Sequence, residues 1–118
     1  MKDALFISPG NASEIYQGLS KNYSAVETPT WALLLAESCR SVGYNVDIID
    51  VAAERLAHQE VLDRIIELMP RFLVFVVYGQ NVNAGTTNMS GAVALSNFIK
   101  SKKLDIPIIY IGSHVQAL

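Results

Sequence analysis

Polar, uncharged residues follow the most apolar run of the chain, and they are the first candidates for chemistry. The run Phe72–Tyr78 leads into Gly79–Asn88, which holds asparagines, threonines and glycines and no charge. Amides and hydroxyls on a flexible backbone suit a large neutral or amide-bearing ligand better than a metal ion. Ligand contact and a simple turn both fit this composition. In either case we expect Thr87 or Asn88 to cap the next helix.

Two other apolar runs also end in small or polar residues. Ala4–Ile7 leads into the segment Ser8–Pro29, which begins with Ser8, Pro9 and Gly10. The last run, Ile106–Ile111, leads into Gly112–Gln116, which begins with Gly112, Ser113 and His114. Parallel strands place their carboxyl ends at one edge of a sheet, and open α/β sheets bind ligands there. These three segments are therefore the positions at which a ligand is expected.

The remaining reactive side chains form no catalytic set. No Ser-His-Asp or Cys-His arrangement has the spacing that nucleophilic catalysis needs. Asp50 ends an apolar run, at the position where dinucleotide-binding folds hold a ribose. Because no Gly-x-Gly-x-x-Gly follows the first apolar run, we expect Asp50 to cap the next turn instead. His58 begins a helical pattern and is expected to be solvated. The single cysteine, Cys39, excludes an internal disulfide framework and a cysteine-cluster metal site.

Composition narrows the class of protein. Of the 118 residues, 51% are hydrophobic and 17% are charged, which excludes intrinsic disorder. A net charge of −2 argues against a general nucleic-acid surface. The longest apolar runs stop far short of the roughly 20 residues that span a bilayer. The N-terminus lacks a signal-peptide pattern, so we expect a cytoplasmic protein without a membrane partner.

Apolar runs alternate with helical patterns along the chain. Strands are predicted over 4–7, 46–50, 72–78 and 106–111, and helices over 31–42, 58–69 and 89–102. This order predicts a parallel sheet with helices on both faces, an α/β, flavodoxin-like (Rossmann-like) three-layer fold. Such sheets have five strands in the order 2-1-3-4-5. We therefore expect 1–118 to be a single, C-terminally truncated domain, the N-terminal fragment of a longer protein.

Each predicted helix has an expected buried face. The first is expected to pack through Trp31, Leu34, Leu35, Ser38 and Val42, with Ala32, Ala36 and Cys39 close by, so that much of its circumference is buried. The second is expected to bury Val61, Leu62, Ile65, Ile66 and Met69, and the third Ala92, Val93, Leu95, Phe98 and Ile99. The fourth strand would be an exposed edge, through which a homo-oligomer could form.

Two stretches and the end of the chain resemble a known family. Val26–Ala36 contains a Pro turn and a Leu-Ala helix, and Cys39–Asp50 contains a basic residue, Gly-Tyr-x-Val and a strand that ends in Asp. Tyr110–Val115 is similar to a Gly-Gly-x-His stretch, with Ser113 in place of the second Gly. Together these resemble the N-terminal cobalamin-binding domain of cobalamin-dependent radical S-adenosylmethionine enzymes.

The resemblance implies a module that holds cobalamin over the strand ends. The candidate cofactor contacts are Ser8, Pro9, Gly10, Tyr78, Gly79, Gln80, Asn81, Asn83, Thr86, Thr87, Gly112, Ser113 and His114. The Asp-x-His-x-x-Gly motif that supplies a lower axial histidine is absent, and many members of the family lack it. An iron–sulfur cluster and S-adenosylmethionine would belong to a catalytic domain downstream in the same chain. This segment alone is then expected to catalyse nothing.

Two alternatives to cobalamin binding stay open at this point. One is a non-catalytic flavodoxin-like domain for protein interaction or assembly, with its open sheet edge as the contact. The other is a flavin-binding electron carrier, since Gly10–Glu14 faintly resembles a flavodoxin phosphate loop. In flavodoxins a helix begins directly after that loop and meets the phosphate with its N-terminus. Here the first strong helical pattern begins some fifteen residues later.

Overall fold

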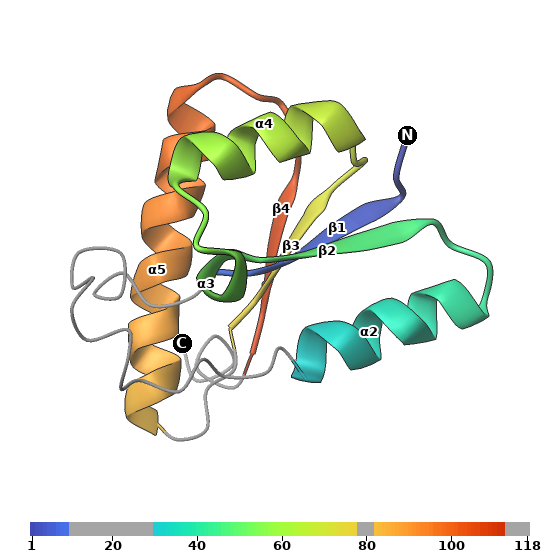
Figure 1. Ribbon diagram of the computed structural model, residues 1–118, viewed down its shortest axis with the longest axis horizontal. Helices are drawn as coiled ribbons and strands as arrows, with labels where there is room; N and C mark the ends of the chain where they lie inside the picture. Colours follow the sequence, from blue (N-terminus) through green and yellow to red (C-terminus); the bar gives the residue numbers. More distant parts are fainter. Residues whose placement is uncertain (10–29, 78–81, 113–118) are drawn as a thin grey trace.

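The computed structural model describes residues 1–9, 30–77 and 82–112 (Figure 1). Strands and helices alternate in the order predicted, with one short helix added after the second strand. The elements are β1 (Ala4–Ser8), α2 (Thr30–Ser41), β2 (Val46–Asp50), α3 (Val51–Glu54), α4 (His58–Leu68), β3 (Leu73–Val76), α5 (Val82–Ser101) and β4 (Ile108–Ile111).

The four strands form one parallel sheet in the order β2-β1-β3-β4. This order and the helices between the strands confirm the α/β, flavodoxin-like class. β3 is an inner strand, and all four of its residues are buried, as its unbroken apolar sequence predicts. β4 lies at one side of the sheet and is its last strand among the described residues.

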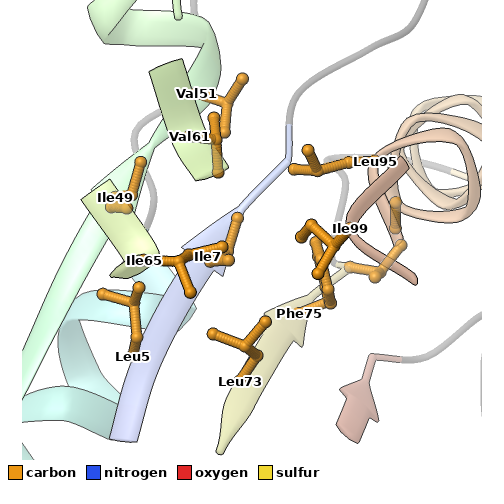
Figure 2. Close-up of a cluster of buried hydrophobic side chains, with 12 residues drawn as sticks. Leu5, Ile7, Ile49, Val51, Val61, Ile65, Leu73, Phe75, Leu95 and Ile99 are labelled. Carbon is orange, nitrogen blue, oxygen red and sulfur yellow. The ribbon is translucent and has the colours of Figure 1, made fainter. Parts of the chain in front are cut away.

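One face of the sheet is covered by α3, α4 and α5, and we call it the α4–α5 face. Its strand side chains are large and fully enclosed, among them Leu5, Ile7 and Phe75. Figure 2 shows Val61 and Ile65 of α4 on one side of this cluster and Leu95 and Ile99 of α5 on the other. Burial of so much apolar surface makes this the main core of the domain.

The opposite face of the sheet carries α2, and we call it the α2 face. Its buried strand residues are Ala4, Phe6, Val46, Val74 and Val76. The helix meets them through the fully buried Ala32 and Ala36, with Leu35 and Cys39 partly buried beside them. Two alanines one turn apart let the helix approach the strands closely, because they add almost no side-chain bulk between the two backbones.

The predicted packing of α2 is therefore wrong in two respects. Trp31, Leu34 and Val42 were expected to face the sheet, but all three are exposed, Trp31 by 50% and Leu34 by 54%. The helix is also buried along one narrow stripe rather than over much of its circumference. The expected end of the helix is confirmed, because Gly43 adopts a positive φ of 95° and the amides of Gly43 and Tyr44 bond to Arg40 and Cys39 carbonyls.

Expectations for α4 hold in part. Val61, Leu62 and Ile65 are buried as predicted. Ile66 is 54% exposed. Met69 lies just beyond the helix as its C-cap, with a left-handed backbone conformation, and is also exposed. The helix thus buries a narrower stripe than the sequence indicates.

The start of α5 corrects the predicted polar loop. The helix begins at Val82, so residues 82–88 are helical and neither Thr87 nor Asn88 caps it. Further along, Ala92, Leu95 and Ile99 are buried as predicted, Phe98 is partly buried, and Val93 is exposed. Asparagine, threonine and glycine have low helix propensities, so the sequence does not predict that the first two turns of this segment are helical.

Candidate functional site

The connections of the sheet create one place where a crevice is expected. β1 lies between β2 and β3, and the chain leaves β1 toward α2 but leaves β3 toward α5. These two helices lie on opposite faces of the sheet (Figure 1). The connections after β1 and β3 therefore diverge, and in doubly wound sheets ligands bind outside the strand ends at such a point.

Residues at the ends of three strands lie in one row at this edge. Ile7 pairs with Phe75, and Val76 pairs with Ile111. Continuing both registers places Pro9 level with Val77, and Val77 level with Gly112. All three are buried, and Ser8 beside them is partly buried. The structure thus brings the described candidates Ser8, Pro9 and Gly112 to one edge of the sheet, although they lie at opposite ends of the sequence.

Gly112 has a structural reason to be glycine. The amide of Val77 donates to the carbonyl of Ile111 at 2.7 Å, which holds the two strand ends together. A Cβ on Gly112 would lie 2.7 Å from the carbonyl carbon of Val77 and would clash with its carbonyl oxygen. Only glycine allows this close approach of two backbones. The sequence pointed to Gly112 as a ligand contact, but this packing role depends on a neighbour that is distant in sequence.

Asp50, at the end of β2, caps the short helix α3 as expected. Its Oδ1 accepts from the amide of Ala53 at 3.2 Å, and its own amide donates to Glu54 Oε2 at 3.2 Å. Glu54 also pairs with Arg64 of α4 at 3.0 Å. Burial raises the pKa of the Asp50 carboxyl above its ordinary value, and the nearby Glu54 charge raises it further. Asp50 is the one acidic residue at the described strand ends.

The other sequence candidates fall into two groups. Asn83, Thr86 and Thr87 lie in the first two turns of α5, the helix that follows β3. Their backbone is therefore helical, where a loop was expected. The remaining candidates lie outside the described residues: Gly10, Tyr78, Gly79, Gln80, Asn81, Ser113 and His114.

His58 differs from its expected surroundings. Its side chain is partly buried, and its ring centroid lies 5.4 Å from that of Phe98 on α5. Burial lowers the pKa of the imidazole below its ordinary value. Lys102 lies over the same Phe98 ring at 5.1 Å. The sequence gives no sign of the contact between His58 and Phe98, because it joins α4 and α5, the helices that precede and follow β3 in the chain.

A metal site and a membrane-spanning helix are two other features that the described residues could carry. Within 1–9, 30–77 and 82–112, no three histidine, cysteine or acidic side chains gather as a metal would need. No described helix has the length and apolarity to cross a membrane. Comparison with protein families, curated proteins and solved structures finds no match to this chain. The geometry of the strand ends therefore carries the functional argument.

Proposed function

We propose that this domain binds cobalamin at the carboxyl edge of its sheet and presents the corrin to a radical S-adenosylmethionine domain downstream in the same chain. The observation that carries the proposal is the row of strand ends at the point where the connections diverge. Ser8, Pro9 and Gly112 lie together there, each with a small side chain or none, and Ser8 is partly exposed. A wide, flat ligand needs such a low surface.

The chemistry of this edge supports a large and mainly neutral ligand. Asp50 is the one described acid there, and its carboxyl is occupied in capping α3. The helix that follows β3 begins with Val82–Asn88, an uncharged segment that contains Asn83, Thr86, Thr87 and Asn88. Corrin side chains end largely in amides, and amides and hydroxyls can donate and accept hydrogen bonds to them without adding charge.

The role of this chain would be to bind and orient the cofactor. When bound, cobalamin would supply a cobalt centre for methyl or electron transfer. Residues at the strand ends, among them Ser8, Pro9 and Gly112, would hold the ring at the carboxyl edge of the sheet. The reaction itself belongs to the proposed downstream domain, together with its iron–sulfur cluster and S-adenosylmethionine.

A second candidate function is protein interaction or assembly, and one observation favours it. Trp31, Leu33 and Leu34, in the first turns of α2, are all about half exposed. Exposed apolar side chains gathered on one helix are typical of contact surfaces. This function predicts partner binding with no retained chromophore, which separates it from the first.

Cobalamin binding can be tested with the complete chain. The protein is mixed with hydroxocobalamin, or separately with flavin mononucleotide, under anaerobic conditions, passed through a gel-filtration column, and examined by visible spectroscopy. We expect corrin absorbance to elute with the protein. Elution of protein without corrin would count against the proposal, and retained flavin would favour an electron carrier.

A pair of substitutions locates the site. Ser8→Trp places a bulky ring at the end of β1 and should weaken cobalamin binding at least about tenfold, because binding at this edge requires open space. Arg71→Trp places the same ring at an exposed position before β3, at the opposite edge, and should leave binding unchanged. Equal effects of the two variants would contradict the proposed location. Circular dichroism of both variants checks that they fold.

A further inference from the structure

Ser8 and Asp50 are neighbours at the carboxyl ends of two adjacent strands. β1 and β2 pair in parallel, and the last pair of their register joins Ser8 to Asp50. Such strands lie about 4.8 Å apart, and side chains alternate between the two faces along each strand. Ser8 follows Phe6 by two positions and Asp50 follows Ile48, and both of those residues pack on the α2 face. A hydroxyl and a carboxylate thus lie side by side there, neither of them fully buried.

The carboxylate of Asp50 can accept more hydrogen bonds than its helix cap requires. Its Oδ1 accepts from the amide of Ala53, whereas a carboxylate has two oxygens with about four lone-pair positions between them. The backbone around it is also fixed in place. The Asp50 amide donates to Glu54, and Glu54 pairs with Arg64 of α4. The structure therefore holds this acceptor at the end of β2 and leaves part of its capacity for a ligand.

A sugar hydroxyl is the group that this pair of side chains matches. A hydroxyl both donates and accepts, so it can donate to the carboxylate of Asp50 and accept from the hydroxyl of Ser8. An amide nitrogen could donate to Asp50 but could not accept from Ser8, and an anionic group would be repelled by the carboxylate. In dinucleotide-binding folds an acid at this position accepts from a ribose hydroxyl.

We propose that Asp50 and Ser8 bind a hydroxyl of the ribose in the nucleotide arm of cobalamin. The inference rests on the proposed function, in which the corrin lies over the ends of the inner strands. β2 lies on the far side of β1 from β3 and β4, so Asp50 is beside the row of strand ends rather than within it. The arm is the part of cobalamin that carries a sugar. Asp50 thereby favours the complete cofactor over a corrin that lacks the arm.

Cobinamide tests this inference, because it has the corrin ring and lacks the nucleotide arm. The affinities of the complete chain for cobalamin and for cobinamide are measured by equilibrium dialysis with corrin absorbance as the readout. Asp50→Asn should weaken cobalamin binding about tenfold, as expected for a hydrogen bond to a charged group, and change cobinamide binding less than about twofold. Asparagine is also a good N-cap, so this variant keeps the cap of α3.

Two further variants make the result specific. Asp50→Ser also keeps a capping side chain but has no carboxylate, and it should lose cobalamin affinity as Asp50→Asn does. Asp47→Asn is the matched control, because Asp47 lies on the same strand and its Oδ1 likewise accepts from a backbone amide, that of Ile48. It removes the same charge nearer the amino end of β2 and should leave both affinities unchanged. Circular dichroism checks that all three variants fold.

The outcomes separate this inference from the proposed function. Equal weakening of cobalamin and cobinamide by Asp50→Asn would overturn the inference, because the carboxylate would then act on the corrin or on the fold. So would an unchanged cobalamin affinity in Asp50→Asn, or an equal loss in Asp47→Asn. In each of these cases the unchanged chain still binds cobalamin, and the proposed function stands. If the unchanged chain binds neither corrinoid, the proposed function fails and the inference fails with it.

Discussion

The two faces of the sheet are covered in different ways. On the α4–α5 face, two long helices bring branched side chains such as Val61, Ile65 and Leu95 against Leu5 and Phe75, and all of them are excluded from solvent (Figure 2). On the α2 face, one helix meets the strands through Ala32 and Ala36. On the α4–α5 face, large side chains of both the helices and the strands fill the core. On the α2 face, the helix approaches the strands closely through its alanines, and its large side chains lie on its exposed side.

The difference shows that the size of an apolar side chain does not decide where it lies. In α2 the small residues are buried and Leu33 and Leu34 are about half exposed. The helix lies against β2 and β1, where the larger Phe6 and Val46 fill the space between helix and sheet. In a closely packed core, the side chains of helix and strand together must fill the space between the two backbones. A helix that packs on large strand side chains must therefore carry small side chains on its buried face.

Matched phenylalanines test the comparison with the largest expected effect. Phe75→Ala on the α4–α5 face should lower the free energy of unfolding by about 5 kcal/mol, near the top of the range for buried Phe→Ala, because rigid neighbours leave a cavity and Tyr110 loses its stacked ring. Phe6→Ala on the α2 face should cost about 3 kcal/mol, since a single helix can settle into the gap. Urea denaturation measures both, and a larger cost at Phe6 would reverse the comparison.

Overpacking tests the α2 face alone. Ala36 is fully buried against the strands, and Ala36→Leu should destabilise the protein by about 1–3 kcal/mol, because the helix must move off the sheet. Leu34→Ala removes a larger side chain from the exposed side of the same helix and should change stability by less than about 0.5 kcal/mol. The urea denaturation midpoints of the two variants, each compared with the unchanged protein, measure these effects. A tolerated Ala36→Leu would mean that α2 does not pack closely.

Much of the fold could be predicted because local signals and topology agree. The unbroken apolar run at Leu73–Val76 identifies an inner strand, and Gly43 identifies the end of α2. The face of α2 could not be predicted in the same way. Every position from Trp31 to Ala36 is apolar, so periodicity does not distinguish the buried stripe from its neighbours. The choice is made by the strand residues that the helix meets.

The candidate site could be predicted as a place more readily than as a set of residues. Parallel topology alone assigns Ser8, Pro9 and Gly112 to one edge of the sheet, and the structure agrees. The close approach of Gly112 to Val77 could not be foreseen, because it depends on the register of two strands. Likewise the helical start of α5 could not be foreseen, because asparagine, threonine and glycine have low helix propensities.

The smallest expected effect is a pH dependence on the α4–α5 face, where His58 of α4 contacts Phe98 of α5. Burial lowers the pKa of His58 from the ordinary value of 6.5, so between these two values the unfolded chain binds the proton and the folded chain does not. The stabilising contribution is therefore complete above pH 6.5 and is lost as the pH falls through the lowered pKa. The loss should stay under about 1 kcal/mol, because the ring is partly exposed.

His58→Phe isolates this contribution, because it keeps a ring against Phe98 and removes the titration. Urea denaturation between pH 7.5 and 5.5 should show the unchanged protein losing more stability than the variant. Asp50 is present in both proteins, so its contribution cancels in the comparison. Its pKa is raised by burial, so that contribution is complete below the ordinary 3.8 and is lost as the pH rises through the raised pKa. Parallel pH profiles would show that His58 is solvated, and that the two helices leave this part of the α4–α5 face as open as the outer side of α2.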